Sequence, residues 1–452
     1  MKQWLMILYV IMGFSLYGCG GSSGGGGSHT QASLRVIHAG ADAPKVNITA
    51  NQSALVEGLD YGESSGFAKV ASQNYEVKVN ALLPDQSTLT VITEDYDLKA
   101  ERNYSAIAIG SVADNSLEVL VVENADSAVA SGYVRVQAVH GSPTVPTVDV
   151  YVTSPDEDIA SASPALTLSY RQFSDQLSVP AGDYRIRITP EGTKTVVFDS
   201  GTVPLASGTD LLVTAAPNVY GGNTTSPVVL VAASGTGASV IFDQTTGADL
   251  RAVHAVSDAP AVNVLLNDST TPAVADLTYL NESPFLQVPA GTQDVTVNVP
   301  SLSADVLKDI PVSLEQGKFY NAIVLGSVEA SDSFDIELLP FEEDRRKVAT
   351  EAKISLVHGS VSAGTVDVYI TPTSDISSAS PTISNFVYKQ TITGVGLMPG
   401  EAVVSITPAG SKTVAIGPLT VNFEGGKLYG AIAQDAVNGG APLGINGFDE
   451  LN

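Results

Sequence analysis

The chain has few of the residues that usually carry chemistry or cross-link small folds. Among its 452 residues there is one cysteine, Cys19, and one tryptophan, Trp4, and both belong to an N-terminal segment outside the repeated part. A single cysteine excludes a disulfide framework and a cysteine-rich zinc site. No later stretch approaches the 18 apolar residues that a transmembrane helix needs. The chain is too long for one core, so we expect several domains.

Positive charge is also scarce. Lys and Arg number 22 against 48 Asp and Glu, which gives a net charge of −26, and charged residues make up only 15%. Such a field repels nucleic acid and anionic headgroups, so neither is an expected partner. The excess of acid predicts a solvated surface. Specific cation binding is the alternative, and Asp156-Glu157-Asp158 could offer oxygen ligands to Ca²⁺, although it lacks the spacing of a calcium loop.

The first 32 residues read as an export signal and a tether. Lys2 precedes an apolar run over residues 4–16, and Leu-Tyr-Gly-Cys ending at Cys19 resembles a bacterial lipobox. We therefore expect a signal peptide over 1–18, lipidation of Cys19, and a Gly/Ser-rich tether over 19–32. The acyl chains would be the membrane partner of the protein. Because Gly20 rather than Asp follows the cysteine, the lipoprotein is expected in the outer membrane of a Gram-negative bacterium.

One stretch, residues 32–49, returns three more times. Each copy has an alternating run that ends in His, a turn-forming loop, and then Val-[Asn/Asp]-[Val/Ile]. The Asn or Asp follows the His by nine residues in every copy. The pairs are His38 with Asn47, His140 with Asp149, His254 with Asn263, and His358 with Asp367.

The copies define four domains of two alternating types, over residues 33–131, 132–247, 248–349 and 350–452. The first and third (type A) share Asp-Ala-Pro and Tyr-x-Ala-Ile-x-x-Gly-Ser-Val. The second and fourth (type B) share Thr-Val-Asp-Val-Tyr and Ile-Thr-Pro-x-Gly-x-Lys-Thr-Val. The order A-B-A-B indicates that a two-domain unit was duplicated. We expect each A domain to pack on a B domain in a defined way.

The fold class predicted is all-β, with four tandem immunoglobulin-like β-sandwich domains. Runs such as 75–80, 184–189 and 294–299 alternate apolar and polar residues, which is typical of a sheet with one buried face. About seven such runs occur per repeat, between Pro/Gly turns. Leu314-x-x-Gly317-x-x-Tyr320 and its counterpart ending at Tyr429 have the spacing of a tyrosine corner.

The pattern Val-x-x-His-Ala-x-x-Asp-Ala-Pro-x-Val-[Asp/Asn]-Val, then Leu-x-Tyr and Val-Pro-Ala-Gly, resembles the bacterial domain-of-unknown-function family 4397. This family occurs in exported proteins and lipoproteins. The resemblance covers nearly all of the chain after the tether in four copies, and the fourth departs at 360–364, where the Pro-containing loop is missing. It implies a secreted sandwich domain without a defined activity.

The repeated histidines are interpreted as structural. Residues two and four before each His are apolar and the residue three before is polar (Arg35, Gln137, Arg251, Ser355). Strand alternation therefore turns the His inward, where it would close the core and bond a loop. A metal ligand set needs three or four donors, and each domain offers one His. The Asn or Asp is expected to face solvent or cap a loop. The alternation of Asn and Asp argues against catalysis, which could not lose its carboxylate in half of the copies.

Motifs of hydrolases, metalloproteases and nucleotide-binding loops are missing from the sequence. A Ser-His-Asp triad stays open, because its members can be scattered along a chain. We expect a non-enzymatic envelope lipoprotein that acts as an extended surface spacer, adhesin or protein-interaction module, without catalytic residues, metal or cofactor. The alternative is a protein that binds carbohydrate or another envelope ligand.

Overall fold

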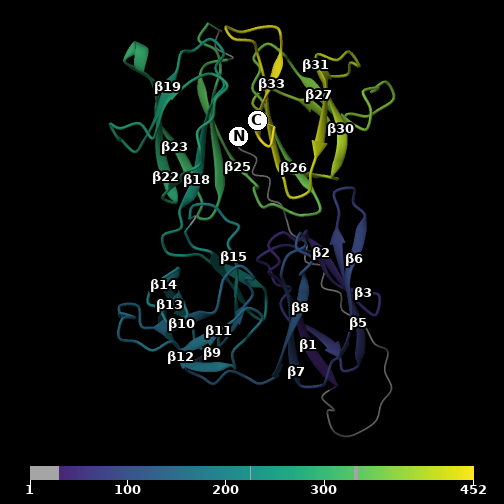
Figure 1. Cartoon of the computed structure of the whole chain (residues 1–452), viewed down its shortest axis with the longest axis vertical. Helices are drawn as coiled ribbons and strands as arrows, with labels where there is room; N and C mark the ends of the chain where they lie inside the picture. The colour runs from purple at the N-terminus through teal and green to yellow at the C-terminus, as the bar shows by residue number, and fades with distance from the viewer. Residues whose placement is uncertain (1–29, 224, 330–333, 452) are drawn as a thin grey trace, which may run out of the picture.

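The computed structural model describes residues 30–223, 225–329 and 334–451. Its regular elements are strands, apart from one 3₁₀ turn, η1 (Pro300–Leu302). They form eight sheets, which pair into four β-sandwiches (Figure 1). The predicted all-β class and the four sandwiches are confirmed.

Sandwich 1 shows the common plan. Its sheets have the orders β4-β1-β7-β8 and β3-β2-β5-β6, and β1 runs parallel to β7 while the other pairs are antiparallel. An immunoglobulin constant domain has seven strands, four on three, so each sandwich here has a different strand order and at least one strand more. The strands are β1 (Gln31–His38), β2 (Val46–Ala50), β3 (Ser53–Leu59), β4 (Ala68–Ala71), β5 (Asn74–Leu82), β6 (Thr88–Asp97), β7 (Arg102–Ile109) and β8 (Glu118–Ala125).

Sandwich 2 repeats this plan with an added edge strand. Its sheets are β12-β9-β15-β16-β17 and β11-β10-β13-β14. The strands are β9 (Tyr133–His140), β10 (Val148–Thr153), β11 (Leu166–Leu168), β12 (Leu177–Pro180), β13 (Gly182–Pro190), β14 (Phe198–Leu205), β15 (Asp210–Pro217), β16 (Val228–Ala233) and β17 (Ala238–Ile241).

Sandwiches 3 and 4 have eight strands each. The sheets of sandwich 3 are β21-β18-β24-β25 and β20-β19-β22-β23, and those of sandwich 4 are β29-β26-β32-β33 and β28-β27-β30-β31. The strands of sandwich 3 are β18 (Ala248–His254), β19 (Val262–Leu266), β20 (Val274–Leu277), β21 (Leu286–Val288), β22 (Gly291–Val299), β23 (Ala304–Leu314), β24 (Phe319–Leu325) and β25 (Glu337–Glu343). Those of sandwich 4 are β26 (Ala352–His358), β27 (Val366–Thr371), β28 (Ile383–Phe386), β29 (Thr391–Leu397), β30 (Gly400–Pro408), β31 (Ile416–Phe423), β32 (Leu428–Gln434) and β33 (Gly444–Asp449).

The tyrosine-corner spacing corresponds to a hydrogen bond in three sandwiches. The hydroxyls of Tyr104, Tyr320 and Tyr429 accept the backbone N–H five residues earlier, at 3.0, 3.1 and 2.8 Å. Sandwich 2 has Leu211 at this position, which offers no hydroxyl. The residue three positions before this corner has a left-handed backbone in every sandwich. It is Glu101, at φ +59°, in sandwich 1 and glycine in the other three sandwiches.

Each type A sandwich packs face to face on the following type B sandwich. Ile37 and Ile107 of sandwich 1 and Val139 and Leu212 of sandwich 2 are at most 1% exposed and share one apolar cluster. A second cluster joins sandwiches 3 and 4 in the same way, through Val253, Ile323, Val357 and Ile432. The A–B packing expected from the alternation is therefore present, as block 1–2 and block 3–4.

This packing buries both faces of the histidine strands. Leu34 and Val36 face the core of sandwich 1, while Ile37 faces sandwich 2. The polar residue three before each His, which alternation turns away from its own core, is consequently covered as well. The exposed fractions are 5% for Arg35, 4% for Gln137, 3% for Arg251 and 4% for Ser355.

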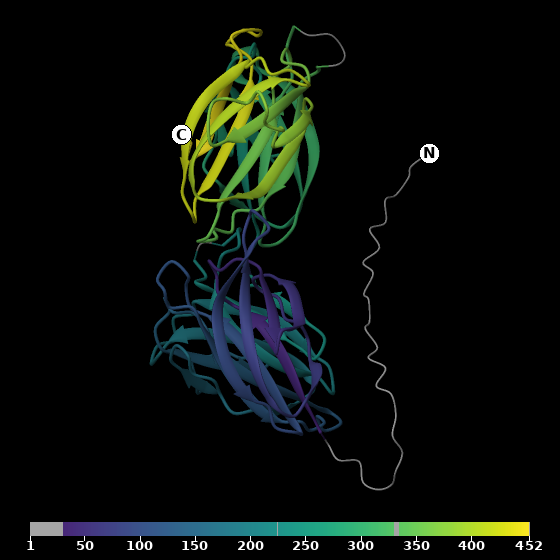
Figure 2. The same ribbon diagram turned by 90° about the vertical axis from the view of Figure 1, so that its right-hand side faces the viewer.

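The two blocks stack along the long axis of the molecule instead of extending in single file (Figures 1 and 2). Sandwich 3 adjoins sandwich 2, where Gly221 N donates to Gly317 O at 2.9 Å. The segment that leads into sandwich 4 adjoins sandwich 1, where Ala349 N donates to Asp42 O at 2.8 Å. The array expected to be extended is thus two domains wide, because the apolar A–B faces fold the chain back on itself.

Candidate functional site

Each repeated histidine is the last residue of the first strand of its sandwich. It is buried, with at most 2% of its surface exposed. Its Nε2 hydrogen-bonds the backbone carbonyl six residues later. Because a carbonyl can only accept, Nε2 carries the proton and Nδ1 is the acceptor nitrogen. Burial lowers the pKa of all four rings, which favours this neutral form. The carbonyls are those of Pro44, Pro146, Pro260 and Gly364, at 3.0, 3.1, 3.0 and 2.7 Å.

A tyrosine stands edge-on to each histidine, within a Leu-x-Tyr motif in sandwiches 1 to 3 and within Phe386-x-Tyr388 in sandwich 4. The ring centroids lie 6.4 Å apart for Tyr61, Tyr170 and Tyr388, and 6.2 Å for Tyr279. In the type A sandwiches the tyrosine hydroxyl crosses to the partner, from Tyr61 to Pro217 O and from Tyr279 to Asp435 O. The histidine loop therefore borders the A–B interface. Sequence reasoning missed this role, although the repeated tyrosine was its visible signal.

The Asn or Asp nine residues later accepts hydrogen bonds from neighbouring backbone or side chains. Asn47 and Asn263 each accept one backbone N–H, from Gly58 and Asp276, both at 2.8 Å. Asp367 accepts two, from Asn385 N at 2.8 Å and Gly410 N at 2.9 Å. Asp149 likewise accepts from Thr167 Oγ1 at 2.6 Å and Gly192 N at 2.8 Å. The carboxylate of type B thus serves the Gly of the Ile-Thr-Pro-x-Gly motif, which is found only in type B.

The Asp-Ala-Pro aspartate of type A has a matching task. Asp42 accepts from Ser111 Oγ, Val112 N and Ala113 N, at 2.8 to 2.9 Å. Asp258 makes the same three bonds at the end of β24, to the Gly-Ser-Val loop. The two motifs that define type A therefore lie together and close one end of the sandwich.

Two arginines at equivalent positions cross the A–B interfaces. Arg35 donates to Ala233 O and Ser234 O of sandwich 2 at 3.0 and 2.8 Å, and burial lowers its pKa to about 10. Arg251 pairs with Asp449 of sandwich 4 and with Glu343, each at 3.2 Å. Breaking a buried pair of this kind usually costs about 3 to 5 kcal/mol. These residues act in domain pairing, and the sequence marked them only as polar.

Arg346, between sandwiches 3 and 4, joins the two blocks. Its guanidinium donates to Ala43 O at 2.7 Å and pairs with the carboxylate of Asp60 in sandwich 1. Burial acts to raise the pKa of Asp60, but Arg346 and the Tyr61 N–H outweigh it, so that pKa lies below its ordinary value. A cavity of about 210 Å³ lies beside this pair, lined by Tyr220, Lys318 and Arg345 among others.

The chemistry available at the histidines is limited. Within the described residues, Nδ1 of His38, His140 and His358 has no hydrogen-bond partner, and that of His254 accepts Val256 N. No group of three or more His, Cys, Asp or Glu in this part of the chain is placed to hold a metal ion, and the Asp156–Asp158 loop is included in that statement. Cys19 and the predicted signal peptide lie outside the described residues, and no helix within the described residues is long and apolar enough to cross a membrane.

The three most exposed large apolar side chains described lie where block 3–4 ends. Leu302, Val437 and Val328 are 66%, 65% and 57% exposed, the highest values among the large hydrophobic side chains described. All three follow strands (β22, β24 and β32) that begin on the side of block 1–2 and run away from it, so they lie at the end of the molecule that we call the distal end. Thr30, the first described residue, lies at the opposite end, before β1 (Figure 2).

Comparisons with known proteins extend this description. No curated protein matches the chain. Among solved structures, the Bacillus anthracis TIE protein is 11% identical, with 90% of this chain and 68% of that chain covered and a TM-score of 0.15. The multi-modular glycogen-degrading pneumococcal virulence factor SpuA is 10% identical, with 85% and 38% covered and a TM-score of 0.16.

The family comparison matches more than half of the chain. The profile of the domain of unknown function DUF4397 matches residues 32–151 and 248–369. Each match spans a type A sandwich and the first two strands of the type B sandwich that follows. The two matches are consistent with tandem copies, and the repeated histidine loops lie inside them. The chain therefore belongs to the DUF4397 family.

Proposed function

We propose that this protein is a non-enzymatic lipoprotein of the cell envelope that presents an interaction surface at its distal end. One observation carries the proposal: the three most exposed large apolar side chains described follow strands that end away from the attachment of the predicted tether. Contiguous exposed apolar patches on a folded surface mark sites of interaction, and we infer that these side chains contribute to one. Block 1–2 would then be the base, and block 3–4 the binding end.

The connection between the blocks supports this arrangement. An interaction module held away from a membrane needs a defined direction, and Arg346 and Asp60 tie the blocks together across 286 residues of sequence. The neutral, buried histidines and the cross-interface tyrosines serve the same end, because they hold the sandwiches in place instead of offering reactive groups. The acidic surface keeps such a module away from anionic headgroups.

Two variants test the proposal. Cys19→Ser should move the protein from the outer-membrane fraction to the soluble periplasmic or secreted fraction. Val328→Ser with Val437→Ser should reduce adhesion of the cells, or capture of envelope partners by purified protein, at least tenfold. Met398→Ser, which removes a 46% exposed apolar side chain elsewhere, is the control. Equal binding by all three proteins would refute the distal site.

A further inference from the structure

Sandwich 2 contains a cavity of about 200 Å³ between its two sheets. The corresponding cavity in sandwich 4, which is of the same type, has about 50 Å³. Interiors of proteins are normally packed as densely as organic crystals. A cavity of this size is therefore a feature of sandwich 2 that needs a physical cause.

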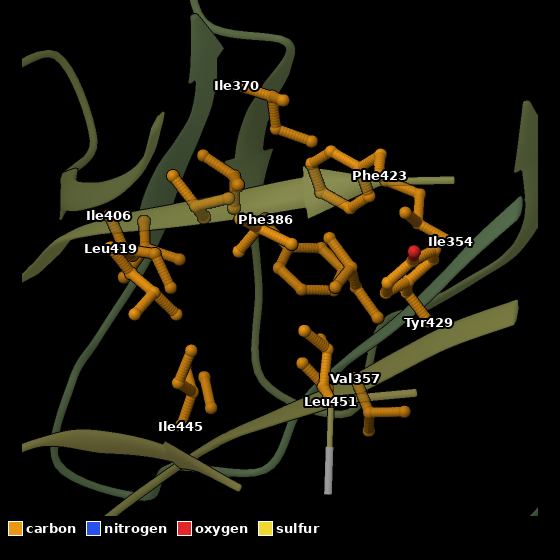
Figure 3. A pocket seen from close by; sticks show the side chains of 17 residues that line it. Ile354, Val357, Ile370, Phe386, Ile406, Leu419, Phe423, Tyr429, Ile445 and Leu451 are labelled. Carbon is orange, nitrogen blue, oxygen red and sulfur yellow. The ribbon is translucent and has the colours of Figure 1, made fainter. Parts of the chain in front are cut away.

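The cause is a set of smaller side chains. In sandwich 4, Phe386, Phe423 and Tyr429 fill the interior (Figure 3). Sandwich 2 has leucine at each of the three aligned positions and also loses volume on β9. The aligned pairs are Leu168 with Phe386, Leu205 with Phe423, Leu211 with Tyr429, Val136 with Ile354, and Ala138 with Leu356.

Some aligned positions carry a larger residue in sandwich 2, but they leave the space open. The largest gain is Tyr184, which stands where sandwich 4 has Ala402. Its hydroxyl donates to Pro180 O at 2.7 Å, so the ring is held toward one end of the sandwich. Val213, Phe198 and Ile186 also exceed their counterparts in sandwich 4, yet the larger cavity remains in sandwich 2.

The lining of the cavity reaches one edge of the sandwich. The edge strands there, β11 and β12, have only three and four residues. Leu166, Leu177 and Val179 from these strands line the cavity and remain half-buried. We infer that a ligand enters along this edge, between the two sheets.

The lining and the shape select the ligand. Apart from Tyr184 and His140, the lining side chains are aliphatic, so the buried part of a ligand carries no charge and few polar groups. Three successive inward positions of β13, from Tyr184 to Ile188, line the cavity, a length of about 14 Å at ~3.4 Å per residue. An apolar cavity of about 150 Å³ stays dry and takes up small apolar molecules. We propose that sandwich 2 binds a linear aliphatic chain between its sheets.

The test uses the full chain with Cys19→Ser, which removes the predicted acylation site and hence any competing acyl chain. Decanoate is titrated against a fluorescent alkyl probe. The double variant Leu168→Phe with Leu205→Phe introduces the residues that sandwich 4 has at these positions, and it should weaken decanoate binding at least tenfold. Ala138→Leu is a second filling variant in case the double variant does not fold. Ser178→Ala, on the solvent side of β12, is the control and should bind like the parent.

A second experiment, with phosphatidylcholine vesicles, shows whether the aliphatic ligand comes from a free amphiphile or from a membrane lipid. Binding of decanoate without co-sedimentation with vesicles identifies a free amphiphile. Co-sedimentation that the filling variants abolish identifies an acyl chain of a membrane lipid. If the parent protein binds neither, or if folded filling variants bind as well as the parent, the proposal is wrong.

Discussion

The hydroxyl of Tyr279 donates a hydrogen bond to the backbone carbonyl of Asp435, 2.8 Å away and 156 residues later. Tyr61 bonds Pro217 at the same sequence separation. The two bonds are copies of one interaction, and each joins a type A sandwich to its type B partner. The duplication therefore preserved the pairing of two domains together with the domains themselves.

Tyr279→Phe is expected to lower the free energy of unfolding by about 1 kcal/mol, because it removes one partly buried hydrogen bond. Tyr388→Phe is the matched control. The Tyr388 hydroxyl is buried and has no hydrogen-bond partner in the described residues, so its removal should leave stability unchanged or raise it. Denaturant unfolding of both variants measures the difference. Equal losses would contradict the assignment of the Tyr279 bond.

Asp367→Asn should destabilise sandwich 4 by about 1 kcal/mol. An amide has one acceptor oxygen, so either Asn385 N or Gly410 N would lose its partner. The reverse change Asn263→Asp in sandwich 3 should have little effect, since only Asp276 N must be served there. Thermal unfolding of the two variants, compared with the parent, checks this asymmetry, and a larger loss from Asn263→Asp would oppose it.

Gly317→Ala should destabilise the contact between the blocks more than Gly208→Ala destabilises sandwich 2. Both glycines have positive φ, +79° and +86°, so both variants carry the same backbone strain of about 1 kcal/mol. A methyl group at Gly317 would also meet Phe242 of sandwich 2 at 2.7 Å, whereas nothing lies within 4 Å at Gly208. The difference between the losses of unfolding free energy in the two variants gives the cost of the steric contact with Phe242.

Stability should fall as the pH drops below the ordinary histidine pKa of about 6.5. Burial lowers the folded-state pKa of His38, His140, His254 and His358, so the unfolded chain binds protons first. The buried neutral rings make their full contribution to the free energy of unfolding above the histidine pKa of the unfolded chain. This contribution is lost as the pH falls toward the lower pKa of the folded protein. His254→Gln should remove part of this slope in urea titrations between pH 7 and 5. A variant with the parent slope would contradict it.

Much of the architecture could be predicted from local patterns. Strand alternation around Leu34 and Val36 turned His38 inward, and the buried ring with its loop hydrogen bond lies where that reasoning put it. The A-B-A-B order was inferred from sequence motifs, and the residues of each motif hydrogen-bond to another motif within the same sandwich. Such features depend on contacts that recur at fixed spacing, so four copies made them visible.

The sequence by itself determined the repeated sandwich, the inward histidine and the alternation of two domain types, because each follows from periodicity along a strand. Tertiary structure alone decided that Arg35 and Arg251 lie in buried interfaces, that two blocks stack through Arg346 and Asp60, and that sandwich 2 holds a cavity. These depend on which surfaces meet across more than 150 residues and on the summed volume of side chains from many strands. Neither quantity leaves a periodic signal in the chain.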